Sequence, residues 1–457
     1  MVAVHWRLEL EHACQPRSCV TPESAPEALP GAAERMASFA VRRGPTFLDV
    51  GTLDLSPLLV QVAADRESYD TLVVVGIGGS SLGLRALGEA LAPTAFRGRG
   101  GAHRVRVLES VDPVELDLLL DEVDLSTTCV HVVTKSGSTV ETLANFFYLL
   151  GALTEALGEG EAWRRVRVTT DPNEGPLAAL ARERGLPVFP LPSGIGGRFS
   201  VLTPVALFGL AFAGVDVRAL VEGAAVQRTR FTAALPGANP SLDLALALCR
   251  FYEAGLRDVV FFPYVTRLFP LALWFVQLWA ESLGKPRGKG EPLGPTPLPA
   301  VGTNDQHAQL QLLIEGAHNK VVLFLAAEEE TSPSHPPMAP FPPALGVMRY
   351  LENAPLARVR SRSMEGVQAA LTELGRPHLT LRAASLSPAA MGELVMLLQC
   401  ATAWAGFLWD IDPFDQPGVE QAKRYAHAML GKPGAEALRQ RAEGLLRGAA
   451  NDEGSAI

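Results

Sequence analysis

The sequence predicts an α/β protein in which buried parallel strands alternate with helices in two successive units. Continuous apolar runs rich in β-branched residues, such as the run TLVVV that begins at Thr71, are typical of strands buried on both faces of a parallel sheet. Stretches with helical spacing separate these runs, and that alternation predicts doubly wound sheets. At 457 residues the chain is long enough for two such cores.

The first unit is expected over residues 56–230, after a lead-in segment of uncertain structure over residues 1–55. Thr203 and Pro204 precede the run VALFGLAFAGV, so we expect an apolar helix that carries proline in its first turn. The expected strands of this unit are the runs TLVVVG, RVRVLE, CVHVVT, RVRVTT and LPVFPL.

The second unit is expected over residues 231–430, and a C-terminal helix and tail over residues 431–457. Two proline-rich stretches, residues 286–302 and 331–346, are expected to be loops. The final residues, NDEGSAI, are expected to be disordered. The expected strands are RDVVFFPYV, KVVLFLA and HLTLRAA, and the expected helices are LFPLALWFVQLWAESLG, DQHAQLQLLIEG and a long apolar run near Ala389.

Composition and charge exclude several broad classes of function. The formal net charge is −9, which argues against a general nucleic-acid-binding protein. The five cysteines are scattered without metal-ligand spacing, which favours a reduced cytoplasmic setting, and Cys14 and Cys19 near His12 are interpreted as bystanders. The first residues lack a secretory-signal pattern, and the apolar run from Leu394 to Trp409 is expected to be a buried helix, not a membrane span.

Two strand-to-helix turns have residue types that suit a phosphate group. After Val75 comes Gly-Ile-Gly-Gly, where glycine permits a tight turn and a close approach of the ligand, and then Ser80 and Ser81. Free amides and the positive end of the helix that follows favour an anion. The second turn has four hydroxyls around one ammonium, supplied by Thr134, Lys135, Ser136, Ser138 and Thr139.

Other interpretations of these turns stay open. Ser138 and Glu141 fit the S-x-x-E capping box, so both can serve the helix start alone. Gly-Ile-Gly also fits part of a dinucleotide fingerprint, although Ser81 stands where a third glycine is required and Glu109 comes late for the ribose-binding acid. An NAD-dependent dehydrogenase is therefore an alternative, which protection by NAD in a melting assay would reveal.

With these motifs in order, the chain resembles the glucose-6-phosphate isomerase family, which is built from two sugar isomerase (SIS) domains. The matching motifs span about residues 70–430 and are GIGGSSLG, TKSGSTVET, GGRFSVLTPVALF, AESLGK, GTNDQH and FDQPGVEQAK. The resemblance implies two αβα sandwich domains with parallel sheets and an aldose–ketose isomerase of glycolysis and gluconeogenesis that acts on a small-molecule sugar phosphate. It further implies that no metal or organic cofactor is needed, and that the protein is a homodimer with shared active sites.

The resemblance also implies roles for individual residues. Glu281 matches the base that moves a proton between C2 and C1 of the open-chain sugar, and Arg198 matches the arginine that stabilises the cis-enediolate intermediate. His307 and Lys423 match the residues that open the sugar ring, the histidine in the family reaching into the site of the partner subunit. Substrate binding is implied for Gly79, Ser80, Thr134, Lys135, Ser136, Thr139 and Gln416.

Each catalytic candidate also has a structural interpretation. Without the family, Glu281 is a solvated acid at the end of an apolar helix and Lys423 is an exposed helix cation. His307 would then be a polar residue in the first turn of a helix capped by Thr303 with Gln306. Two further functions stay open, an SIS isomerase of wider scope that also accepts mannose 6-phosphate, and a non-enzymatic sugar-phosphate sensor.

Overall fold

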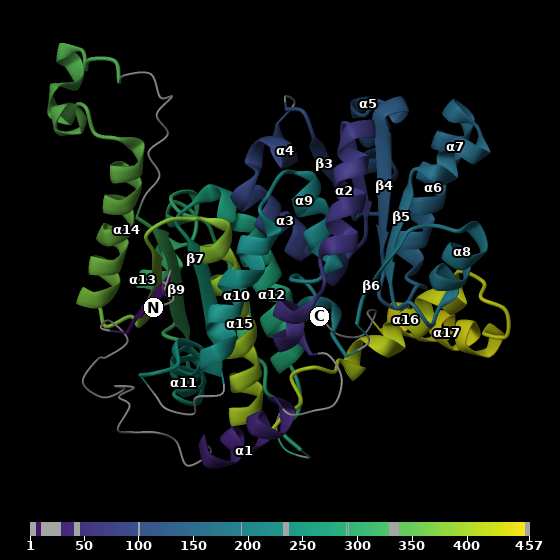
Figure 1. The fold of residues 1–457 in the computed structure, drawn as a ribbon. Helices are drawn as coiled ribbons and strands as arrows, with labels where there is room; N and C mark the ends of the chain where they lie inside the picture. The colour runs from purple at the N-terminus through teal and green to yellow at the C-terminus, as the bar shows by residue number, and fades with distance from the viewer. Residues whose placement is uncertain are drawn as a thin grey trace. The chain divides into compact units, whose positions relative to one another are not determined.

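The computed structural model describes residues 6–10, 29–40, 46–98, 101–192, 194–231, 237–288, 290, 292–328 and 338–452. The chain divides into two compact units, Met1–Pro413 and Phe414–Ile457. The larger unit contains two five-stranded sheets (Figure 1). The smaller unit contains η9 (Pro417–Val419), α16 (Glu420–Met429) and α17 (Glu436–Asp452).

The first sheet is entirely parallel and has the strand order β3-β2-β4-β5-β6. Its strands coincide with the five runs predicted from the sequence. The inner strands β2, β4 and β5 are buried along their whole length, whereas the edge strands β3 and β6 are partly exposed. The strands are β2 (Thr71–Val75), β3 (Arg104–Leu108), β4 (Thr128–Val133), β5 (Val166–Thr170) and β6 (Val188–Pro190).

Helices cover both faces of the first sheet (Figure 1). On one face, Leu119, Phe146 and Leu177 from three helices pack against strand valines. On the other face, the ring of Phe208 lies 4.6 Å from the ring of His131 in β4. The elements of this half are η2 (Phe47–Thr52), α2 (Ser56–Ser68), η3 (Gly78–Ser80), α3 (Leu82–Leu91), α4 (Pro93–Arg97), α5 (Pro113–Glu122), η4 (Leu125–Thr127), α6 (Val140–Leu157), α7 (Glu159–Arg164), α8 (Pro176–Arg184), η5 (Gly197–Phe199) and α9 (Pro204–Phe212).

The second sheet has the order β1-β10-β9-β7-β8 and is parallel except for β1, which pairs antiparallel with β10. Two of its strands were not predicted. β1 lies in the lead-in segment, and β8 lies in the proline-rich stretch expected to be a loop. Pro297 and Pro299 lack an amide donor, but β8 is an edge strand that pairs only with β7, so the sheet tolerates them. The strands are β1 (Trp6–Glu9), β7 (Asp258–Pro263), β8 (Thr296–Pro299), β9 (Lys320–Ala327) and β10 (His378–Ala383).

Helices also cover both faces of the second sheet. Leu313 and Met364 pack on one face with Phe262 and Phe324, and Phe275 of α12 stacks on Phe261 of β7 at 4.5 Å on the other. The elements of this half are α1 (Leu29–Ala40), α10 (Val217–Phe231), α11 (Pro240–Glu253), η6 (Thr266–Leu268), α12 (Phe269–Leu283), η7 (Asn304–Gln306), α13 (Leu310–Ile314), η8 (Pro343–Leu351), α14 (Leu356–Glu373) and α15 (Pro388–Leu408).

Helix α15 is the apolar run that the sequence predicts to be a core helix. It is long and apolar enough to cross a membrane, yet all of its most apolar window is buried inside the protein. It packs against α10, α11 and α12, and α12 in turn packs against α3 of the first half. Helices therefore join the two sheets within the larger unit, and Figure 1 shows them between the blue and the green strands.

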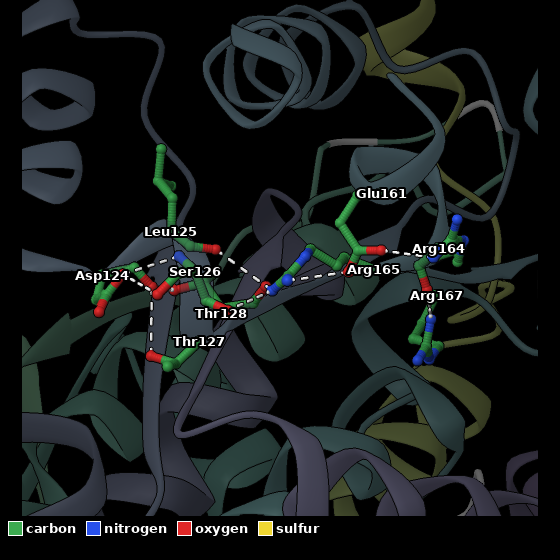
Figure 2. A network of polar contacts seen from close by, with 9 residues as sticks. All are labelled: Asp124, Leu125, Ser126, Thr127, Thr128, Glu161, Arg164, Arg165 and Arg167. Carbon is green, nitrogen blue, oxygen red and sulfur yellow. Dashed lines mark hydrogen bonds and ion pairs between the residues drawn. The ribbon is translucent and has the colours of Figure 1, made fainter. Parts of the chain in front are cut away.

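A polar network closes the edge of the first sheet at which β4 and β5 begin (Figure 2). Arg165 Nη1 donates to the carbonyl oxygens of Ser126 at 3.0 Å and Thr128 at 3.1 Å, and Arg165 Nη2 lies 3.0 Å from Glu161. Asp124 Oδ1 accepts a hydrogen bond from the Ser126 amide at 2.8 Å. These polar groups thus bond to one another at the amino edge of the sheet, although Arg165 Nε is buried without a partner among the described residues, whereas the carboxyl edge carries the turns singled out in the sequence.

The predicted α/β fold class, with two parallel-sheet layers each covered by helices, is confirmed. The segment boundaries at residues 56, 231 and 431 stay a prediction. Of the predicted C-terminal disorder, Asn451 and Asp452 instead end α17, and residues 453–457 lie outside the described residues. The second proline-rich stretch is described only from residue 338 onward, and its last residues begin η8.

Candidate functional site

The turns after β2 and β4 lie next to each other at the carboxyl edge of the first sheet. The two strands are hydrogen-bonded neighbours, with Val75 opposite Val132. The chain goes from β2 to β3 on one side and then crosses to β4 on the other, so the strand order reverses between β2 and β4. Ligands of open α/β sheets bind in the crevice at such a reversal.

The turn after β2 touches η5 through two glycines. Gly78 has a φ of +60°, a left-handed conformation that favours glycine. A Cβ on Gly79 would lie 2.3 Å from the carbonyl carbon of Gly197 and 2.8 Å from the amide nitrogen of Arg198. Only glycine permits this approach, which sets Arg198 beside the turn that also contains the half-buried Ser80.

The loop after β4 gathers hydroxyl groups. Thr134 Oγ1 and Thr139 Oγ1 are 2.8 Å apart, and the Ser138 hydroxyl donates to Ser136 Oγ over 3.1 Å. Thr134 is buried, Thr139 is half-buried, and Ser136 and Ser138 are exposed. The predicted hydroxyl-rich loop is therefore present as a local structure, with its serines open to solvent.

The capping-box interpretation of this loop is wrong. Helix α6 begins at Val140 after the N-cap residue Thr139, and no side chain of the described residues accepts a capping hydrogen bond. The Ser138 hydroxyl bonds to Ser136 instead. The first-turn amides and the positive end of α6 therefore stay available to an anion.

Lys135 supplies a partly dehydrated positive charge in this loop. Burial lowers the pKa of the Lys135 ammonium, the carboxylate of Asp171 opposes that shift, and the charge of Arg198 adds to it. The structure shows Lys135 in no ion pair with any residue that it describes. A dianion placed here would compensate two cations in a protein whose overall charge is negative.

Arg198 lies beside Glu281 in this site and is held in place by further hydrogen bonds. Arg198 is only 1% exposed. Its Nε donates to Ser282 Oγ at 2.7 Å, and its Nη2 donates to the carbonyl oxygen of Pro413 at 2.7 Å. Its Nη1 lies 3.6 Å from Glu281 Oε2, and the Glu281 side chain is 25% exposed. A fixed guanidinium therefore stands beside a carboxylate that solvent, and hence a ligand, can reach.

Gln277 lies in the same site as Glu281, although the sequence analysis did not identify it as a candidate. It precedes Glu281 by one turn of α12, so both side chains lie on one helix face. Its Nε2 would lie 3.2 Å from a Cβ on Gly78. Its Oε1 is buried and has no hydrogen-bond partner among the described residues. The i, i+4 spacing to Glu281 was the signal that could have found it.

His307 is not in contact with these residues. The predicted helix over residues 305–316 forms only in its second half, as α13, because η7 ends at Gln306, His307 follows it, and α13 begins only at Leu310. Thr303 does not cap η7 by its side chain, and Gln306 Oε1 accepts from the Tyr264 hydroxyl at 3.1 Å. The His307 side chain is exposed and bonds to no residue in the part of the chain that the structure describes.

Gln416 and Lys423 lie in the smaller unit. Gln416 precedes η9, and Lys423 is an exposed residue of α16 whose Nζ lies 2.9 Å from Glu420 Oε1. The structural interpretation of Lys423 as an exposed helix cation therefore describes its surroundings within this unit.

Residues considered for other functions have partners or are not described. Glu109, the weak candidate for a ribose-binding acid, is ion-paired with Arg85 of α3. Cys14, Cys19 and His12 lie outside the described residues.

Comparisons with known proteins agree on one family. The family model for phosphoglucose isomerase matches residues 63–443. Glucose-6-phosphate isomerase of Rubrobacter xylanophilus is 43% identical over 373 residues, covering 80% of this chain and 83% of the relative. A solved structure of a hypothetical protein from Thermus thermophilus is similar with a TM-score of 0.81 and 35% identity, over 93% of this chain and 100% of that one. A glucose-6-phosphate isomerase from Chlamydia trachomatis is similar with a TM-score of 0.72 and 25% identity, over 85% of this chain and 75% of that one.

Proposed function

The chain belongs to the phosphoglucose isomerase family, and from this membership we propose that it converts D-glucose 6-phosphate reversibly to D-fructose 6-phosphate. The observation that carries the proposal is the 3.6 Å contact between Arg198 and Glu281. Arg198 and Glu281 lie close to both candidate phosphate-binding turns. A single substrate can therefore contact the two turns and these two side chains.

The phosphate group is proposed to bind first, at the loop after β4 and at Ser80. Lys135, Ser136 and Thr139 supply a charge and hydroxyl donors there, together with the uncapped amides of α6. Binding energy from this remote dianion holds C1 and C2 of the sugar near Glu281, which lowers the entropic part of the barrier.

Proton transfer is proposed to follow on the open-chain sugar. The Glu281 carboxylate takes the proton from C2, the C2–H electron pair forms the C1–C2 double bond, and the carbonyl electrons move onto O1. The guanidinium of Arg198 stabilises this cis-enediolate. Glu281 then returns its proton to C1 while O1 gains and O2 loses a proton, which leaves the ketone at C2. The steps balance without an external oxidant or reductant.

Ring opening is assigned to His307 with Lys423, which move protons at the ring oxygen and at the C1 hydroxyl. Because His307 is exposed and unpartnered among the described residues, we propose a homodimer in which each subunit supplies this histidine to the other's site. The enzyme is proposed to work in the cytoplasm, in glycolysis and gluconeogenesis, a setting that the free thiols of Cys129, Cys249 and Cys400 suit.

A coupled assay with purified protein tests the function. We expect formation of fructose 6-phosphate from glucose 6-phosphate, and no turnover of unphosphorylated glucose, which lacks the group that anchors the substrate. Equal turnover of mannose 6-phosphate would indicate an isomerase of wider scope. Binding of glucose 6-phosphate without turnover would indicate a sensor and would overturn the proposal.

A mixing experiment tests the shared site. Glu281→Gln and His307→Gln are each expected to be inactive. Co-expressed, they form heterodimers in which one of the two sites has both wild-type residues, so each heterodimer should regain about half of the activity of a wild-type dimer. Mixed samples as inactive as either parent, at a dimeric sedimentation coefficient, would contradict the sharing of His307.

A further inference from the structure

Groups of the larger unit itself hold two of the three guanidinium nitrogens of Arg198. Nε donates to the hydroxyl of Ser282 at 2.7 Å, and Nη2 donates to the carbonyl oxygen of Pro413 at 2.7 Å. Because a guanidinium is planar, two such contacts restrict the rotation of its plane. The remaining nitrogen, Nη1, lies 3.6 Å from Glu281 Oε2. Contacts on its other side therefore direct the guanidinium at the carboxylate proposed as the base.

Ser282 couples the arginine to the base. It directly follows Glu281 in the last turn of α12, and its side chain is fully buried. A serine inside a helix commonly bonds a carbonyl oxygen of the preceding turn, whereas the hydrogen bond of Ser282 leads out of the helix to Arg198. The base and the group that orients the arginine are thus consecutive residues, so the helix places both at once.

The backbone next to Arg198 has an anchor of its own in α15. Within the apolar run over residues 394–408, the only side chains with an amide or a hydroxyl group are Gln399 and Thr402. The Thr402 hydroxyl donates to a carbonyl oxygen of its own helix at 2.8 Å, but Gln399 Nε2 donates to the carbonyl oxygen of Phe199 at 2.9 Å. A fully buried amide needs such a partner. Gln399 thereby ties α15 to the residue that follows Arg198.

We propose that Ser282 and Gln399 are positioning residues that act through Arg198, the first by orienting its guanidinium and the second by holding its backbone. This inference rests on the proposed function, because it requires Arg198 to stabilise the cis-enediolate. A displacement of ~1 Å at a reacting group can cost ~10²-fold in rate. Loss of either anchor should therefore lower kcat, while the loop after β4 still binds the phosphate group.

A double-mutant cycle tests the inference. Ser282→Ala and Arg198→Met are made singly and together, and kcat, KM for glucose 6-phosphate and the melting temperature are measured for each. We expect Ser282→Ala to lower kcat by ~10- to 100-fold in the wild-type background, with KM changed by less than about threefold. In the Arg198→Met background it should lower kcat by less than about twofold, because residues that act as a unit are not additive. Gln399→Leu provides a second, independent cycle with Arg198→Met and the same expected pattern.

Affinity for a mimic of the intermediate is a readout that a purely structural role would not move. A five-carbon aldonohydroxamate phosphate carries the phosphate group and, when ionised, an oxyanion where the enediolate would form. We expect Ser282→Ala and Gln399→Leu to weaken inhibition by this mimic ~10- to 100-fold, and inhibition by inorganic phosphate by less than about twofold.

Matched variants measure the cost of deleting a buried polar group elsewhere. Ser241 is also fully buried, and its hydroxyl donates to Asn239 Oδ1 at 2.6 Å. Gln227 of α10 is a fully buried glutamine whose amide has no hydrogen-bond partner among the described residues. Ser241→Ala and Gln227→Leu should keep kcat within about twofold even where they lower the melting temperature, because neither displaces Arg198.

The outcomes separate this inference from the proposed function. If Arg198→Met keeps the wild-type kcat, the proposed role of Arg198 fails and the positioning role fails with it. If Arg198→Met is impaired, a folded Ser282→Ala or Gln399→Leu variant that keeps the wild-type kcat overturns the positioning role of that residue, while the proposed function stands. An equal loss of kcat in both backgrounds would also overturn it, because the effect would then not pass through Arg198.

Discussion

Gly79→Ala isolates the contact between the turn after β2 and η5. The added methyl carbon would lie 2.3 Å from the carbonyl carbon of Gly197, whereas ordinary contact begins at 3.4 Å. The two backbone segments must therefore separate by ~1 Å, because neither is a flexible side chain that can turn away. Gly79 does not have a left-handed φ, so the effect of the methyl group is steric.

That separation displaces Arg198, whose amide nitrogen would lie 2.8 Å from the new methyl group. A ~1 Å error in the position of the guanidinium predicts a loss of ~10²-fold in kcat for glucose 6-phosphate. Overpacking predicts a loss of ~1–3 kcal/mol in the free energy of unfolding. A coupled isomerase assay and urea unfolding measure the two effects.

Gly151→Ala in α6 is the matched control, because a Cβ there meets no atom within 4 Å. We expect it to keep kcat and to stabilise the protein by up to ~1 kcal/mol. Wild-type kcat in Gly79→Ala would refute the reasoning, since the turn and η5 would then not need their close approach.

Two further predictions concern charges. Burial holds the pKa of Lys135 below its ordinary value of 10.5, so charged Lys135 destabilises the folded state at pH 7, and that penalty fades as pH rises from the lowered pKa through 10.5. Lys135→Met should therefore raise the melting temperature at pH 7 without ligand but lose most of the stabilisation by inorganic phosphate; phosphate stabilisation equal to that of the wild type would contradict this. Asp65 forms a buried pair with Arg167, with Nη2–Oδ1 and Nε–Oδ2 distances of 2.5 and 3.0 Å, so Asp65→Asn should lower the free energy of unfolding by ~3–5 kcal/mol while the folded enzyme keeps its kcat. If urea unfolding shows that Asp65→Asn lowers the free energy of unfolding by less than ~1 kcal/mol, the substitution does not leave the buried Arg167 charge uncompensated, and the prediction is wrong.

The strands that sequence reasoning finds are those whose burial is visible in their composition. β2 and β4 are apolar and lie inside the first sheet, and α15 is apolar on all sides because other elements surround it. The composition of β8 does not predict a strand, because its prolines favour a loop unless the segment is known to lie at the edge of a sheet. Edge position is a property of the whole sheet, not of the segment.

In the candidate site, too, some features could be predicted from the sequence and others depend on the fold. The glycines and hydroxyls after β2 and β4 follow from local turn chemistry, so their grouping was predictable. For Gln277, the i, i+4 spacing to Glu281 predicts only a shared helix face; its approach to Gly78, which is far away in the sequence, depends on the fold. The sequence around Ser138 fits a helix cap, but in the folded loop the Ser138 hydroxyl donates a hydrogen bond to Ser136 Oγ instead. Whether the hydroxyl bonds to Ser136 or to the helix start depends on the conformation of the loop.

The most direct test of the proposed chemistry follows the proton itself. Wild-type protein and Glu281→Gln are incubated with glucose 6-phosphate in D2O, and deuterium at C2 is measured by NMR, with binding measured by calorimetry. We predict that the wild type incorporates deuterium, whereas Glu281→Gln binds the sugar phosphate with similar affinity and exchanges ~10²–10⁴-fold more slowly. Exchange by Glu281→Gln at the wild-type rate would mean that another group moves the proton.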